Sequence, residues 1–147
     1  MIQLIRATSL QFKLIRLNLY DKMTNADYRP LMTITSQLTG NSKTFIVATV
    51  NYVNKDRYVE MLVYVQPVSV GENLSGGSIY LGNTDFPLGF YDVVIYQNSS
   101  NSNLDPSGLT TIWNGLMNLT SNSTTHPVEY TEYTTNDSDT ESVYITI

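Results

Sequence analysis

The sequence has no cysteine, a single histidine and few charged residues. Without cysteine, disulfides, thiolate zinc sites and a cysteine nucleophile are excluded. The one histidine, His126, precedes Pro127 in a predicted connection, and no neighbouring residue would orient it as a general base. We therefore interpret it as a solvent-facing loop residue. The sequence predicts no enzyme, no catalytic residues, no cofactor and no metal site.

Long apolar runs are also missing. No window approaches the 18 apolar residues that indicate a membrane-spanning helix. The run at the start of the chain is interrupted by Arg6, Lys13 and Arg16 and has no small-residue cleavage site. We expect neither a secretory signal nor a membrane partner.

Charge is scarce and unevenly distributed. Charged residues make up 14% of the chain. All eight basic residues lie before position 58, whereas ten of the 13 acidic residues lie after position 57. Folding either mixes the two halves in space or leaves one basic and one acidic face. The basic residues are too widely spread to predict a nucleic-acid partner.

What the chain does have is alternation of apolar and polar residues with a period of two, which predicts strands. The runs are 10–20, 44–53, 57–66, 77–82, 90–97, 109–119, 128–134 and 142–147. A change of phase near Ile15 predicts a bulge, and the second and third runs resemble the two arms of a hairpin. The predicted fold is all-β: one domain over 1–147, an antiparallel β-sandwich of about eight or nine strands, immunoglobulin-like or jelly-roll-like.

The last part of the chain, 126–147, differs from the rest. Neither face of 128–134 is cleanly apolar, whereas Val143, Ile145 and Ile147 share one face of the final run. This segment is predicted to be an edge strand within the chain. The alternative is an interaction arm that pairs with a neighbouring subunit.

Acidic motifs carry no specific signal. The stretch 136–141 spaces three carboxylates at alternate positions but lacks the complete calcium-loop pattern, so we interpret it as a polar turn. Pairs drawn from Asp92, Asp105 and Glu129 for glycoside hydrolysis would be found in almost any chain of this length.

The polar loop before residue 109 is predicted to be exposed. Asp105 can bond to its own backbone, Pro106 favours a type I turn, and Gly108 tolerates the exit geometry. Such a loop suits contact with another molecule better than catalysis.

Eleven tyrosines against four phenylalanines also favour contact surfaces, because tyrosine combines an apolar ring with a hydroxyl group. Trp113 beside Asn114 would suit a carbohydrate-binding surface, although packing in or beside the core is favoured. The candidate interaction residues are Tyr91, Tyr96, Asn103, Asp105, Trp113, Tyr130, Tyr133 and Tyr144.

Several motifs of the C-terminal 60 residues resemble those of one family. The matching positions are Gly89, Phe90, Tyr91, Ile95, Tyr96, Gln97, Asn103 to Pro106, Gly115, Leu116 and Glu129 to Thr131. In this pattern a Gly-aromatic-Tyr strand is followed by a Ser/Asn-rich loop and an Asn-Leu-Asp-Pro turn. It is similar to small all-β virion structural proteins of tailed bacteriophages, including crAss-like and other Bacteroidetes phages.

The resemblance implies an auxiliary or minor capsid protein, or a head–tail component, located in the virion after synthesis in the host cytoplasm. Its expected partners are the major capsid protein, other virion proteins or further copies of this chain. A carbohydrate- or host-surface-binding module is the alternative function.

Overall fold

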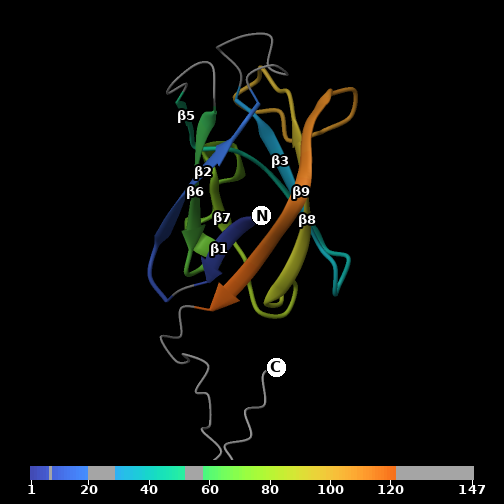
Figure 1. The fold of residues 1–147 in the computed structure, drawn as a ribbon. Coiled ribbons are helices and arrows are strands. Elements are labelled where there is room, and N and C mark those ends of the chain that lie inside the picture. The colour runs from blue at the N-terminus through green and yellow to red at the C-terminus, as the bar shows by residue number, and fades with distance from the viewer. Residues whose placement is uncertain (7, 20–28, 52–57, 122–147) are drawn as a thin grey trace, which may run out of the picture.

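The computed structural model describes residues 1–6, 8–19, 29–51 and 58–121, and within them the protein is all-β, with two sheets (Figure 1). Sheet A has the strand order β1-β9-β8-β3-β4; sheet B has the order β2-β6-β5, and β7 also pairs with β6. The strands are β1 (Ile2–Arg6), β2 (Gln11–Leu17), β3 (Leu31–Ser36), β4 (Ser42–Ile46), β5 (Thr49–Asn51), β6 (Val59–Gln66), β7 (Ser78–Tyr80), β8 (Gly89–Tyr96) and β9 (Thr111–Ser121). Two short 3-10 helices, η2 (Ser69–Gly71) and η3 (Leu74–Gly76), precede β7.

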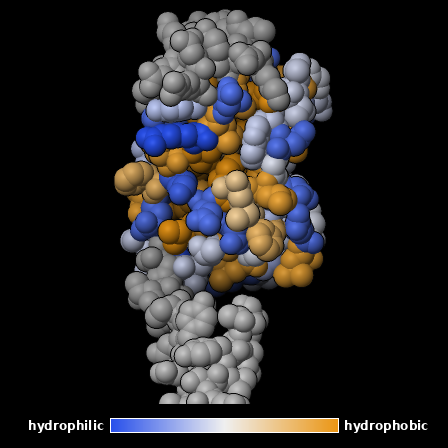
Figure 2. All heavy atoms as spheres, viewed as in Figure 1, coloured by the Kyte–Doolittle hydropathy of each residue, from blue (hydrophilic) through white to orange (hydrophobic). Residues whose placement is uncertain are grey.

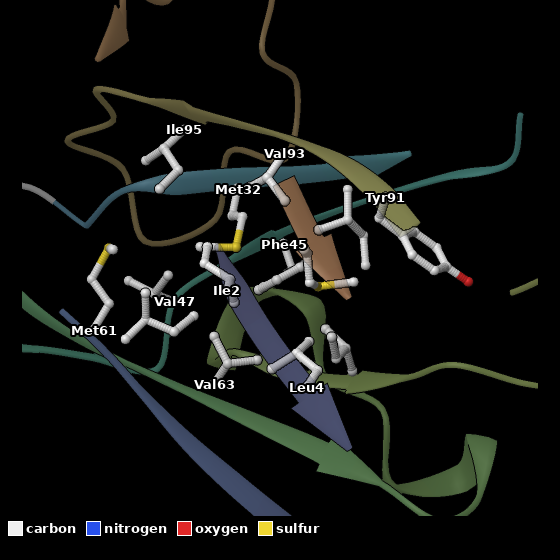
Figure 3. Close-up of a cluster of buried hydrophobic side chains, with 14 of the residues drawn as sticks. Ile2, Leu4, Met32, Phe45, Val47, Met61, Val63, Tyr91, Val93 and Ile95 are labelled. Atoms are coloured by element: carbon white, nitrogen blue, oxygen red, sulfur yellow. The ribbon is translucent and has the colours of Figure 1, made fainter. Parts of the chain in front are cut away.

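The core lies between the two sheets. Every second residue of β6 is buried, beginning at Val59, and Val93 and Ile95 of β8 face the same cluster. Figure 3 shows side chains of β1, β3 and β8 meeting those of β6 in this layer. Because alternate residues of a strand point to opposite faces, one period-two pattern places one set in the core and the other on the surface. The predicted strand character of 57–66, 90–97 and 109–119 is confirmed by β6, β8 and β9.

The strand pairing is mixed, which corrects the antiparallel prediction. β1 pairs with β9 in parallel, Ile2 lying opposite Met117, and β6 pairs with β7 in parallel. Sequence patterns indicate pairing directly only where a tight turn joins two strands. β1 and β9 come from opposite ends of the described chain, so no local signal indicates their direction.

The predicted bulge near Ile15 is wrong. β2 pairs with β6 in continuous antiparallel register, from Gln11 opposite Val65 to Leu17 opposite Val59. The phase change in the sequence instead reflects that the apolar residues Phe12 and Leu14 lie on one face of β2, whereas Ile15 and Leu17 lie on the other. Only Ile15 of this strand is buried.

The predicted strand over 44–53 divides into two strands in different sheets. β4 ends in sheet A at Ile46 and β5 begins in sheet B at Thr49, so Val47 and Ala48 carry the chain across. Gly77 lies against this crossing: its φ is 74°, and a Cβ there would lie 2.2 Å from the Ala48 backbone nitrogen. Only glycine fits this position.

One strand, β3, was not among the predicted runs, whereas the strand character expected of the first 15 residues is confirmed by β1 and β2. β3 is short, but Met32 and Ile34 are buried and it lies centrally in sheet A, between β4 and β8. The predicted strands 128–134 and 142–147, and the segment 126–147 as a whole, lie outside the described residues.

The packing of Trp113 leaves no room for a side chain at Gly115. A Cβ there would lie 2.0 Å from the Trp113 indole, whose ring lies against the core. We expect Gly115→Ala to displace the indole and to lower the free energy of unfolding by about 1–3 kcal/mol. Trp113 is the only tryptophan, so its fluorescence should shift to longer wavelength. Asn114→Ala, at the exposed neighbouring position, is the control; an unchanged spectrum in Gly115→Ala would contradict the packing.

Candidate interaction surfaces

The outer face of sheet A is almost free of charge. Its strands contain three charged residues: Arg6 in β1, Lys43 in β4 and Asp92 in β8. Arg6 and Lys43 occupy the buried phase of their strands and bond toward the other sheet. Asp92 is therefore the single charged side chain on the outward face of the described strands of sheet A, where it accepts a hydrogen bond from the Gln37 amide at 2.9 Å.

The remaining outward residues are apolar or neutral and polar. Phe90 and Leu116 are 52% and 43% exposed, and Ile5 of β1 is also exposed. Hydroxyl pairs of 2.8 Å, Thr33 with Thr44 and Thr35 with Ser42, lie on β3 and β4. We call this surface the neutral face; its members are Gln3, Ile5, Thr33, Thr35, Ser42, Thr44, Phe90, Asp92, Val94, Asn114, Leu116 and Asn118.

Arg6 and Lys43 explain why the neutral face lacks cations. The Arg6 guanidinium donates to the carbonyl oxygens of Leu81 and Phe86 and to the Asn83 side chain. The Lys43 ammonium group pairs with Glu72 and donates to the Tyr80 carbonyl oxygen. Each edge strand of sheet A thus has one cationic side chain that bonds to the segment 72–86. This segment contains β7 of sheet B and the start of the connection from β7 to β8.

A second apolar surface lies on β2, an edge strand of sheet B, and on Leu10 directly before it. Leu10, Phe12 and Leu14 are 51%, 72% and 38% exposed; we call these three residues the β2 strip. Phe12 lies opposite Tyr64 of β6 and Leu14 opposite Leu62, so the strip continues onto two half-buried apolar side chains.

The β2 strip borders a shallow groove of about 240 Å³ between β1 and β2. Figure 2 shows apolar surface framed by hydrophilic side chains on the side of the molecule where β1, the edge strand of sheet A, is seen between β6 and β9 in Figure 1. The groove is lined by Met1, Ile2, Gln3, Lys13, Leu14, Ile15, Arg16 and Leu17.

A larger groove of about 550 Å³ lies where the ends of β1, β6, β7 and β9 meet. Its polar lining includes the Arg6 guanidinium, the Gln66 and Asn83 side chains and Tyr80. Arg6 already bonds to Asn83, and the Gln66 amide donates to the Ser78 hydroxyl at 2.5 Å. These groups therefore hold the fold together as well as lining the groove.

The predicted interaction residues do not form one surface. Tyr91 is fully buried, its ring stacks with Phe86 at 6.5 Å, and its hydroxyl donates to the Pro87 carbonyl oxygen at 2.6 Å. It is thus a core residue, which corrects its assignment as a contact residue. Trp113 is half-buried against the core, and Tyr96 is half-buried at the end of β8.

Asn103 and Asp105 belong to a loop stabilised by its own polar groups. The Asn103 side-chain oxygen accepts from the Asp105 amide at 3.0 Å, and Asp105 accepts from the Ser107 amide at 2.9 Å. That bond from Ser107 lowers the pKa of the Asp105 carboxyl group. The backbone turn bond runs from Leu109 to Pro106, with Gly108 at φ 76°, one residue later than the predicted turn.

Tyr130, Tyr133 and Tyr144 lie outside the described residues. Sequence reasoning missed Leu10, Phe12, Phe90 and Leu116 as exposed apolar residues. The alternation places each of them on one face of a strand, but it does not tell which face the second sheet covers.

The described residues define an all-β protein with two candidate contact surfaces. Within them, no group of three or more His, Asp or Glu side chains could hold a metal ion. No helix in this part of the chain is long and apolar enough to cross a membrane. Comparison with protein-family models, curated proteins and solved structures found no match to this chain.

Burial raises the pKa of the Tyr91 phenol, while a hydrogen bond with Ser36 and the charge of Arg6 oppose this shift. The folded state therefore holds the proton more tightly than the unfolded state, and the resulting stability is lost as pH rises above about 10. We expect Tyr91→Phe to lower the free energy of unfolding by about 0.5–1.5 kcal/mol at neutral pH, because the bond to Pro87 is lost.

Above pH 10 the difference in free energy of unfolding between the wild type and Tyr91→Phe should become smaller. The wild type loses stability as its phenol ionises, whereas the variant has no phenol at this position. Urea unfolding at pH 7 to 11 measures both effects. Tyr96→Phe controls for the loss of a hydroxyl group from β8. A difference in free energy of unfolding that stayed constant up to pH 11 would contradict a raised pKa of the buried Tyr91 phenol.

The two ion pairs among the described residues should differ in strength. Lys43 and Glu72 are 13% and 25% exposed, whereas Arg16 is 60% exposed beside Glu60. Double-mutant cycles with Lys43→Met and Glu72→Gln should give a coupling of about 1.5–3 kcal/mol. The matched cycle with Arg16→Met and Glu60→Gln should give about 0.2–1 kcal/mol. Equal couplings would mean that Lys43 does not hold the two sheets together.

Proposed function

We propose that this chain is a non-enzymatic virion structural protein of a tailed bacteriophage, an auxiliary or minor capsid protein or a head–tail component. In this proposal it is an immunoglobulin-like or jelly-roll-like β-sandwich that docks on the major capsid protein or on other virion subunits. The resemblance of the motifs between Gly89 and Thr131 to those of phage virion proteins gives the class, and the neutral face is the observation that carries the proposal.

The composition of the neutral face suits a protein contact. Charged residues are depleted at the centres of protein interfaces, where aromatic residues are enriched. Here one carboxylate, Asp92, already bonded to Gln37, stands among Thr, Asn, Ser and apolar side chains. Burying this face would desolvate few charges.

The size of the face also supports docking. Five strands about 4.8 Å apart make a face roughly 24 Å wide, and strands of about six residues make it roughly 20 Å long. Its projected area is therefore about 500 Å², and the relief of the side chains adds to this area. A standard interface takes about 800 Å² from each partner, so the neutral face could supply most of one partner's share.

Phe90 and Leu116 are the expected anchors. Asp92 of β8 lies opposite Leu116 of β9, which makes Phe90 and Leu116 diagonal neighbours on the outward face. Exposed aromatic and aliphatic side chains near the centre of a contact contribute most to binding.

Carbohydrate binding is the second candidate, and the 550 Å³ groove is the observation that favours it. An aromatic side chain, Tyr80, lies there with the amide group of Gln66 and the guanidinium of Arg6. Trp113, the sequence-based candidate for this role, packs half-buried against the core.

The proposed function is tested by incorporation of variants into virions of the phage that encodes this chain, measured by mass spectrometry of purified particles. Phe90→Glu should lower the copy number per particle at least tenfold, because it places a charge in the contact. Leu38→Glu, at a position 78% exposed outside the strands of the neutral face, is the matched control and should incorporate normally.

Circular dichroism first establishes that both variants are folded. Absence of the wild-type chain from purified particles would overturn the proposed function. Normal incorporation of Phe90→Glu would overturn the neutral face as its contact. Glycan binding by the isolated chain, lost in Tyr80→Ala, would favour the second candidate.

A further inference from the structure

The β2 strip is unexplained by docking through the neutral face, because it belongs to the other sheet. β2 pairs with β6 along its whole length and with no second strand among the described residues. Its outer edge therefore presents backbone N–H and C=O groups that another strand could use. The strip adds three exposed apolar side chains beside those groups.

The other sheet edges are shorter and therefore less suited to accept a strand: β1 and β4 have five residues each, and β7 has three. β5 has three residues, and a short edge offers few hydrogen bonds. On β4 the Lys43 ammonium group and the hydroxyls of Ser42 and Thr44 already bond within the molecule. β2 has seven residues and is the longest edge strand of the two sheets.

Charge indicates what kind of strand fits β2. Residues 1–19 contain Arg6, Lys13 and Arg16 and no acidic residue. Lys13 forms no ion pair with another described residue. Two copies of β2 side by side would bring like charges together, whereas an acidic segment would complement them.

The C-terminal segment of the chain has the matching composition. Residues 122–147 contain five acidic residues and no lysine or arginine. Within this segment, residues 141–147 place Val143, Ile145 and Ile147 at alternate positions after Glu141. This alternation matches that of Leu10, Phe12 and Leu14.

The chain leaves the described structure close to β2. Ser121, the last residue of β9, lies opposite Arg6, and four residues lie between Arg6 and Gln11, so the two are at most about 18 Å apart. The intervening residues 122–140 number 19 and could span at most about 65 Å, so residues 141–147 can reach β2. A segment joined to the same chain is present near β2 at a higher effective concentration than a second copy at micromolar protein, which favours pairing within one chain.

We propose that residues 141–147 add as a strand to the free edge of β2 of the same chain, with Val143, Ile145 and Ile147 beside the β2 strip. The added strand covers apolar surface, bonds to the open backbone groups and brings Glu141 to the basic edge. This inference does not depend on the proposed virion function, since the free chain in solution suffices to test it.

Disulfide trapping tests the inference directly, because the native chain has no cysteine. We expect Phe12→Cys combined with Ile145→Cys to form an intramolecular disulfide under mild oxidation, because the central residues of the two strips lie opposite each other in either strand direction and adjacent strands bring such Cα atoms within the required 4.4–6.8 Å. The matched control combines Ile145→Cys with Leu38→Cys: Leu38 is 78% exposed, against 72% for Phe12, and lies in the turn between β3 and β4 of sheet A. It should cross-link at least tenfold more slowly.

Non-reducing electrophoresis at 5 µM protein distinguishes the outcomes. A compact monomeric product in the β2 pair alone supports the proposal. Cross-linked dimers would overturn it in favour of pairing with a second copy. Equal rates in the two pairs, or no product in either, would overturn it as well.

Hydrogen exchange of the full chain gives an independent readout. Ile145→Lys should speed the exchange of the β2 amides that do not bond to β6 at least tenfold, because it removes an apolar contact with the strip. Thr146→Lys, at the adjacent position with the opposite orientation, is the control and should have a smaller effect. Unchanged exchange in Ile145→Lys would show that the segment does not cover β2.

Discussion

Burial of alternate side chains between the two sheets is the interaction on which the rest of this structure depends. The chain has no disulfide, so two incomplete sheets are joined mainly by side chains such as Phe45, Met61 and Val93. Each large apolar side chain contributes about 1.5–3 kcal/mol when buried, against a net stability of about 5–15 kcal/mol for a typical domain. A charged residue on the inward face must therefore reach the rim of the core.

The side chains of Arg6 and Lys43 reach the rim of the core in this way, and this explains why the neutral face has no cationic side chain. Both belong to the edge strands of sheet A, and both carry their charge to carbonyl oxygens around the connection from β7 to β8. The Lys43 ammonium group also lies 5.0 Å from the centre of the Phe86 ring, in a cation–π contact. The cations that hold the sheets together are thus the ones absent from the neutral face.

The sequence predicted those features of the fold that are local. Alternation identifies β6, β8 and β9 because each has one buried and one open face. It failed for β2, since a period of two does not tell which face meets the second sheet, and for 44–53, since the change of sheet at Val47 follows from distant packing against Gly77. Tyr91 was misassigned because its hydroxyl finds its partner, the Pro87 carbonyl oxygen, inside the fold.

The two candidate surfaces differ in physical character, which argues that they meet different partners. The neutral face is broad, lies on paired strands and offers side chains alone, so it suits a folded surface of complementary shape. The β2 edge is narrow, basic and offers backbone groups, so it suits an extended acidic segment. Ser121 ends beside β1, whose other neighbour at the open side is β2, and the proposed strand 141–147 of the same chain would be such a segment. Covering this edge would leave the neutral face as the main apolar surface through which the subunit meets other proteins.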